Sequence, residues 1–132
     1  MTIEIFTFCE EVTFDETKGL LSIQNAFDAS RQTVPVVIGK LWVGGRLRFE
    51  YSEAGEHKLL VRLVDPESTL IASGGASFII KPSEHHSTTI PVVIDFYNGL
   101  FKSLGRYAAI LALDGLDVHS TPLFIKKPLT LS

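Results

Sequence analysis

The sequence predicts an all-β protein, built as an antiparallel β-sandwich of about eight or nine strands. Three observations support this prediction. Apolar and polar residues alternate with a period of two along most of the chain, which is typical of strands that bury one face. Apolar residues at helical spacing are hard to find. Short segments rich in Gly, Pro, Asp and Ser recur at close intervals, as they do between the strands of sandwiches.

The composition is that of one globular domain, which we place at residues 1–132. A chain of 132 residues is long enough to bury a core without disulfides. Its apolar content of 45% is ordinary, and its charged content of 20% is slightly low, which favours apolar surface that an oligomer would cover. The formal net charge is -3 and neither half of the chain is basic, so nucleic acid is not an expected partner.

The first third of the chain predicts three strands, separated by a turn and a loop. The strands cover residues 3–12, 20–27 and 36–43, the turn covers 15–19 and the loop covers 28–35. The single cysteine, Cys9, excludes an intrachain disulfide. We expect Cys9 to act as a small buried hydrophobe in the first strand.

The middle of the chain predicts three more strands. They cover residues 46–52, 57–64 and 70–81, joined by turns over 52–56 and 65–68. Leu47, Phe49 and Tyr51 alternate with charged residues and are expected to face the core. The glycine pairs Gly44-Gly45 and Gly74-Gly75 lack the lysine and the helix of a phosphate-binding loop, so we interpret them as β-bulges or bends.

The last third begins with a strand over 88–97. Pro91 cannot donate a ladder hydrogen bond, which predicts an edge position for this strand. A loop over 98–105 follows and contains Leu100 and Phe101 where polar residues are expected. We expect these two side chains to plug the open end of the sandwich, or to contact another subunit.

The chain closes with a hairpin. The stretch RYAAILAL (106–113) is apolar on both faces and predicts a central strand. Asp114-Gly115 predicts a two-residue type I′ turn. Gly105 before Tyr107 predicts a corner in which the tyrosine hydroxyl bonds to upstream backbone. The apolar residues of the last strand change parity, so a bulge is expected near 119–122.

Three stretches resemble a bacterial family known only as a domain of unknown function. They are FTFCEEVTFDETKGLLSIQNAFDAS, GEHKLLVRLVDPES and NGLFKSLGRYAAILALDGLDVHSTPLFI. The shared pattern is an acidic, apolar first strand, a turn into a strand ending in Phe-Asp, a Gly-Glu-His strand ending in Val-Asp, and a closing Gly-X-Tyr hairpin. The resemblance implies an immunoglobulin-like fold and carries over no catalytic residue.

Targeting signals are not apparent in the sequence. The first stretch, MTIEIFTFCEEV, has no basic region and contains three glutamates, so a signal peptide is not expected. No apolar run approaches the length that spans a membrane. We therefore expect a cytoplasmic protein without membrane insertion.

Metal binding would have to use the four histidines, His57, His85, His86 and His119. His85 and His86 are adjacent, and neighbouring side chains of an extended chain point to opposite faces, so they cannot easily share one ion. The sequence has no HExxH motif, cysteine pair or Asp-rich calcium loop. We expect solvated histidines, no metal and no other cofactor.

No catalytic constellation is apparent either. Asp117, His119 and Ser120 crowd into one strand, where they cannot point at one another as a triad requires. Glu10 and Glu11 are adjacent on a strand and face apart, whereas the carboxylates of a glycosidase converge across a cleft. We therefore expect a protein that is not an enzyme.

One charged constellation supports a site hypothesis. The strands 46–52 and 57–64 are expected to pair as a hairpin. Arg46 then lies opposite Arg62 on the outer face, with Arg48 next along the strand. Like charges placed opposite each other destabilise a sheet unless the side chains splay or share an anion or a partner carboxylate. These arginines are our candidate binding residues for an acidic ligand or partner; the alternative is that they extend into water.

Two hypotheses about function remain open. The first is a non-enzymatic sandwich module that binds a protein partner, or a second copy of itself as a homo-oligomer, through a sheet face or edge. The second is a small-ligand or anion binder, or an enzyme, with a pocket in the loops at one end. A stable dimer that buries the 88–97 edge would favour the first. A deep end pocket with convergent acids would favour the second. We favour the first.

Overall fold

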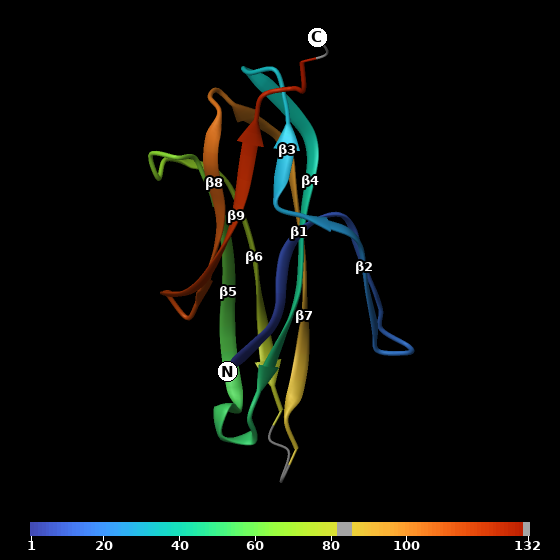
Figure 1. Cartoon of the computed structure of the whole chain (residues 1–132). Helices are drawn as coiled ribbons and strands as arrows, with labels where there is room; N and C mark the ends of the chain where they lie inside the picture. The colour runs from blue at the N-terminus through green and yellow to red at the C-terminus, as the bar shows by residue number, and fades with distance from the viewer. Residues whose placement is uncertain (82–85, 131–132) are drawn as a thin grey trace.

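The computed structural model describes residues 1–81 and 86–130, whose strands form two packed layers (Figure 1). The elements are β1 (Thr2–Asp15), β2 (Leu20–Phe27), β3 (Ala29–Arg31), β4 (Val36–Phe49), the 3-10 helix η1 (Tyr51–Glu53), β5 (Gly55–Val64), β6 (Leu70–Ile80), β7 (Thr88–Phe101), β8 (Gly105–Leu113) and β9 (Leu116–Lys126). One sheet has the order β2-β1-β4-β7 and the other β3-β9-β8-β5-β6. The prediction of an all-β sandwich is confirmed, and its immunoglobulin-like detail stays a prediction.

The pairing within the sheets is antiparallel with one exception. The short strand β3, within the predicted loop 28–35, runs parallel to the end of β9. The remaining neighbours in both sheets pair antiparallel. Within the described residues, no helix has the length and apolar character needed to cross a bilayer.

The core lies between the two layers. Phe8, Val43 and Phe49 reach it from one sheet, and Leu63 and Tyr107 reach it from the other. Phe49 is 0% exposed and Tyr107 is 1% exposed, as the alternation of their strands predicts. Burying an apolar side chain of this size contributes roughly 1.5–3 kcal/mol, so this layer of side chains is the main source of the fold's stability.

A single strand, β4, replaces the two strands predicted over 36–43 and 46–52. Gly44-Gly45 lies in unbroken register with β1 and β7, and Gly74-Gly75 lies in regular register with β5. The predicted bulges are therefore wrong. The glycines are needed for space instead, because a Cβ atom on Gly45 would lie 2.3 Å from the Ile5 carbonyl oxygen, and one on Gly75 would lie 2.3 Å from that of Leu59.

The predicted hairpin between residues 46–52 and 57–64 is also wrong. The first segment falls in β4 and the second in β5, and these strands belong to different sheets. Between them the chain turns through η1. The Glu50 N–H donates to the Glu53 carboxylate at 3.0 Å, and the Glu53 N–H donates to the Glu50 carbonyl at 2.9 Å. Tyr51, predicted to face the core, is 59% exposed in this turn. The connection thus carries the chain from one layer to the other.

The predictions for the closing hairpin are confirmed. Strand β8 is central, between β9 and β5. Asp114 and Gly115 form the two-residue turn with φ values of 51° and 86°. The Tyr107 hydroxyl donates to the Ser103 carbonyl at 2.8 Å. The bulge in β9 falls at Val118, just before the segment where it was expected.

The edge prediction for Pro91 is confirmed, since β7 is the last strand of its sheet. Phe101 and Leu100 belong to β7 and not to a loop. Phe101 is fully buried and closes this end of the core, as expected, whereas Leu100 is exposed.

The hairpin of β1 and β2 projects from the body of the sandwich (Figure 1). Beyond Cys9, β1 pairs with β2 and no longer with β4. The side chains of Val12 and Ile23 pack at Gly44, on the outer face of β4. Cys9 is buried beside this contact, as predicted, and burial raises the pKa of its thiol. The base of the hairpin is therefore anchored by a small apolar cluster outside the main core.

Candidate functional site

Two of the three predicted binding residues, Arg46 and Arg48, lie together on the outer face of β4. Both bond to one carboxylate, that of Glu4 on β1: Arg46 Nε lies 2.8 Å from Glu4 Oε1, and Arg48 Nε lies 2.9 Å from Glu4 Oε2. The register of β1 against β4 shifts between Ile3 and Ile5, so Glu4 is the extra residue of a bulge. The bulge places a carboxylate between two cations.

The electrostatics of this cluster follow from that geometry. Hydrogen bonds from Arg48 first, and from Arg46, hold the pKa of Glu4 below its usual range. The Glu4 carboxylate in turn raises the pKa of Arg48. The Arg48 guanidinium also donates to the Ser87 hydroxyl at 2.6 Å. An internal carboxylate thus occupies the position that the sequence assigned to a shared anion.

Arg62, the third candidate, lies on β5 in the other sheet, so the structure does not bring the three arginines together. The predicted pairing of Arg46 with Arg62 is therefore wrong. Arg62 bonds through Nη2 to the Asp117 carboxylate of β9, at 2.5 Å. Its Nε atom is buried without a hydrogen-bond partner among the described residues. Anion binding by these arginines stays a prediction.

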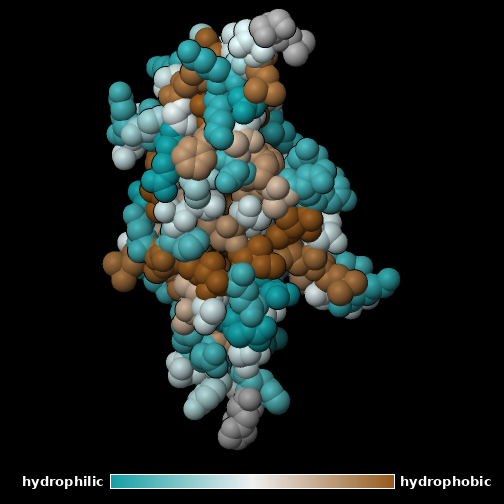
Figure 2. All heavy atoms as spheres, in the orientation of Figure 1, coloured by the Kyte–Doolittle hydropathy of each residue, from teal (hydrophilic) through white to brown (hydrophobic). Residues whose placement is uncertain are grey.

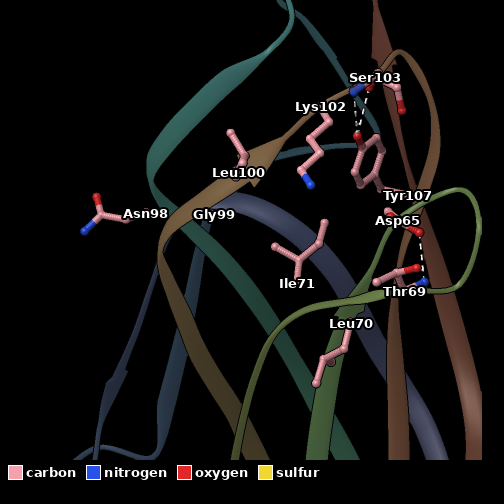
Figure 3. A pocket seen from close by; sticks show the side chains of 10 residues that line it. All are labelled: Asp65, Thr69, Leu70, Ile71, Asn98, Gly99, Leu100, Lys102, Ser103 and Tyr107. Atoms are coloured by element: carbon pink, nitrogen blue, oxygen red, sulfur yellow. Dashed lines mark hydrogen bonds between the residues drawn. The ribbon is translucent and has the colours of Figure 1, made fainter.

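A pocket opens at the end of the sandwich, where the β5–β6 turn meets the end of β7 (Figure 3). It encloses about 320 Å³. Ile71 and Leu100 form apolar walls, and the Lys102 side chain extends into the space between Leu100 and Tyr107. Asn98 turns away from the pocket.

Two polar side chains of this end pocket, those of Asp65 and Tyr107, already form hydrogen bonds with the backbone. The Asp65 carboxylate accepts the N–H groups of Glu67 and Thr69 at 2.9 and 2.8 Å, which fixes the β5–β6 turn. The Tyr107 hydroxyl is used in the corner described above. Lys102 is the remaining charged group that lines the pocket, so the lining offers one cation and no convergent acids.

His57 forms a bonded network at the opposite end of the sandwich. Its Nδ1 atom lies 2.7 Å from Asp114 Oδ2, and its Nε2 atom lies 2.7 Å from the Glu53 carbonyl oxygen. The ring packs against Phe49 and Phe78, with centroids 5.2 and 5.8 Å away. The Glu53 carbonyl first, and the Asp114 carboxylate second, raise the pKa of His57. No nucleophile belongs to the network, so its role is to join the β8–β9 turn to η1.

The other catalytic candidates do not converge. Asp117 bonds Arg62 on the outer face, whereas the His119 ring contacts Phe6, a core residue, with centroids 5.7 Å apart. Glu10 accepts a hydrogen bond from Asn25 at 2.8 Å, on the exposed hairpin. Across the described residues, no three His, Cys, Asp or Glu side chains gather in a way that could hold a metal ion. His86 is exposed, and His85 lies outside the described residues.

A stripe of apolar and aromatic side chains covers the outer face of β4 and β7. In the ladder, Val37 pairs with Leu100, Lys40 with Tyr97, Trp42 with Asp95, and Gly44 with Val93. Exposure is high for the apolar members: Val37 57%, Tyr97 59%, Leu100 44% and Val93 40%. We call Val37, Lys40, Trp42, Val93, Tyr97 and Leu100 the β4–β7 stripe.

Lys40 orders the aromatic part of the stripe. Its ammonium group lies 4.4 Å from the ring centroid of Trp42 and 5.3 Å from that of Tyr97. The Tyr97 hydroxyl donates to the Asp95 carboxylate. Cation–π attraction of this kind is worth about 0.5–1 kcal/mol at an exposed site. The two rings are therefore held in place in the free protein.

From the sequence we predicted contact surfaces at strand 88–97 and at Leu100, but we did not predict that they form one continuous stripe. The strands change face near Gly39 and Asn98: Ile38 and Leu41 both pack on the core, although they are three residues apart. Asn98 adopts a φ of 54°, which accommodates the switch in β7. Gly39 and Asn98 were the available signals, since both residue types tolerate unusual backbone conformations.

A second apolar region is visible on the face shown in Figure 2. Brown side chains form a band across the middle of this face, from the β8–β9 turn towards the β1–β2 hairpin. Leu116 and Val118 of β9 and Leu20 of β2 are exposed apolar residues in these elements. Unlike the β4–β7 stripe, this band crosses from one sheet to the other.

Together these features define a two-layered β-sandwich with charged and apolar groups arrayed on the outer faces of its sheets. The chain belongs to DUF6941, a family of unknown function whose model matches residues 4–126. This confirms the resemblance to a family of unknown function. Among curated proteins, none matches the chain.

One similar solved structure is that of a β-glucuronidase from glycoside hydrolase family 2. The match has a TM-score of 0.48 and 17% sequence identity, and it covers 68% of this chain but 11% of that chain. A similarity of this size supports no argument about activity. The functional argument therefore depends on the surfaces of this chain alone.

Proposed function

We propose that this chain is a non-enzymatic β-sandwich module that binds another protein through the β4–β7 stripe. The observation that carries the proposal is the line of exposed apolar side chains over two neighbouring strands, with the half-buried Trp42 and the charged Lys40 between them. Contiguous apolar patches on soluble proteins mark interaction sites, and interface cores are enriched in Trp and Tyr.

The stripe also indicates the chemistry of the partner. Apolar residues lie at both ends, Val37 with Leu100 at one and Val93 at the other. Lys40 lies between them and forms no ion pair with an acidic side chain among the described residues. A partner surface that presents apolar side chains around a carboxylate complements this pattern. Because Lys40 already orders both rings, binding loses little side-chain entropy.

The projecting hairpin supports the same proposal. Val12 and Ile23 lie over Gly44, the residue that pairs with Val93 at the end of the stripe. The hairpin therefore forms a wall beside the stripe, and a bound partner would meet two surfaces at an angle. Such a corner limits the shapes that fit and favours one specific partner over non-specific adhesion.

The end pocket gives less support to a small-ligand function. Its Asp65 and Tyr107 groups are engaged by the backbone, which leaves Lys102 as the remaining charged group in the lining. Pockets that recognise small molecules place several polar groups so that they converge on the ligand. Protein binding at the stripe is therefore the function that we propose.

Site-specific photo-crosslinking in cells of the source organism tests this proposal. A photoreactive phenylalanine analogue replaces Tyr97 in one variant and Leu116, in the other apolar region, in a second. We expect a discrete protein adduct from position 97 and none from position 116. Adding Lys40→Glu to the first variant abolishes that adduct, because it places like charges in the interface, whereas the matched change Lys102→Glu preserves it. An adduct from position 116 alone, or equal adducts from both positions, would overturn the proposal.

A further inference from the structure

Several strand edges have no hydrogen-bonded neighbour within the described residues. Strands β2 and β7 are the outer members of one sheet, and β6 and the short strand β3 are those of the other. The first part of β1, Thr2–Thr7, lies beyond the end of β2, and the part of β9 before Phe124 lies beyond the end of β3. Free edges are templates for pairing with another chain, and proteins usually block them with charges, prolines or bulges.

Most of these edges carry such a block. β7 contains Pro91, which lacks an N–H group, and a charged aspartate. β1 has the bulge at Glu4, and β9 has the bulge at Val118 followed by Pro122. In β2, Asn25 adopts a φ of 52°, which breaks the extended backbone.

The edge of β6 is different. Its sequence, LIASGGASFII, contains no charged residue and no proline. The register with β5 is regular from Ala72 to Ile80, and the one shift lies at the start of the strand. Ser73, Gly75, Ala76 and Ser77 are exposed. An extended, uncharged edge of small residues lets the backbone of another strand approach closely.

The sequence of β6 also complements itself. About a centre at Gly75, the strand reads nearly the same in both directions. In an antiparallel pair of two copies, Ser73 lies opposite Ser77 of the second copy, and Gly74 lies opposite Ala76. Ala72 then lies opposite Phe78, which matches a small side chain with a large one. Every opposed pair has a like-sized or complementary partner, and no charges meet.

We propose that the partner of the β6 edge is a second copy of this chain, with the two β6 strands paired antiparallel about a twofold axis at Gly75. A twofold interface uses the same patch on both subunits, so a self-complementary strand is what it requires. The pairing joins two five-stranded sheets into one sheet of ten strands. It leaves the outer face of β4 and β7 free, so each dimer presents two β4–β7 stripes and does not depend on them.

Charge variants at positions 73 and 77 test the pairing. In the double variant Ser73→Glu with Ser77→Glu, each new carboxylate lies opposite a basic residue on β5 of the same chain, either Arg62 or Lys58, so the fold gains favourable pairs. Between copies, however, two like-charge pairs form. We expect sedimentation equilibrium to show a dimer for the natural chain and a dissociation constant raised about tenfold for this variant.

The matched control is Ser73→Glu with Ser77→Lys, which places opposite charges across the twofold axis. We expect this variant to remain dimeric. Thermal unfolding of all three proteins confirms that each is folded. A monomeric natural chain, or equal dissociation constants for both variants, would overturn the Gly75-centred pairing. Because the variants leave the β4–β7 stripe intact, crosslinking from position 97 separates this result from the proposed function.

Discussion

Gly45 shows how one absent side chain allows two strands to approach. An added Cβ atom would lie 2.3 Å from the Ile5 carbonyl oxygen, so β1 and β4 would have to move apart. We predict that Gly45→Ala lowers the free energy of unfolding by about 1–3 kcal/mol. Gly39→Ala is the matched control, because no atom lies within 4 Å of the added Cβ. Urea titration of both variants checks this, and equal stability would contradict the close-approach explanation.

His57 links the stability of the fold to pH. A protonated imidazole donates from both nitrogens, to Asp114 and to the Glu53 carbonyl, whereas a neutral ring donates from one. Because the pKa of His57 is raised on folding, its stabilisation is complete below the unfolded value of about 6.5 and is lost as the pH rises through the folded value. The pKa of Asp114 is lowered, chiefly by His57, so its contribution is lost at acid pH.

We therefore predict that the free energy of unfolding falls as the pH rises above about 6.5, the unfolded pKa of a histidine. The variant His57→Gln should lose most of this dependence, because glutamine does not titrate. Urea titrations at several pH values measure both slopes. If the natural protein and the variant share one slope, another group is responsible.

For the strands and turns, the conformations that single residue types favour were better predicted than which strands pair with each other. The Asp114-Gly115 turn, the edge position of Pro91 and the corner at Tyr107 each follow from the conformations that these residue types favour. The segment after Phe49 also reads as a turn. A turn sequence does not say whether the next strand pairs with the previous one or crosses to the other sheet, and here it crosses.

The hydrogen bond of Tyr107 allows a test of the connection between β7 and β8. Its hydroxyl donates to the Ser103 carbonyl, which ties β8 to the end of the preceding loop. We predict that Tyr107→Phe lowers the free energy of unfolding by about 1 kcal/mol, because a partly buried hydrogen bond is lost. Tyr97→Phe is the control, since that hydroxyl is exposed and its loss should change stability by less than about 0.5 kcal/mol. Similar losses for both variants would argue against the corner.

Over the whole molecule, the two-layer fold was predictable, but the surfaces that we propose for binding were only partly so. Alternation assigns each side chain to a face, which is why the burial of Phe49 and the outer-face position of the half-buried Arg46 and Arg48 could be anticipated. Alternation does not identify the sheet to which a strand belongs, so Arg62 was placed beside the wrong strand. The bulge at Glu4 also left no clear pattern in the sequence, whereas Gly39 and Asn98 were signals of the change of face.

The central claim is that this sandwich acts by association at its surfaces, with β6 as the open edge. Hydrogen–deuterium exchange, measured along the chain at low and high protein concentration, tests this most directly. We predict that amides within Leu70–Ile80 exchange more slowly at high concentration while those of β7 do not change, because new interstrand hydrogen bonds form at β6 alone. Exchange that is independent of concentration in β6, or protection that appears in β7 instead, would contradict the account.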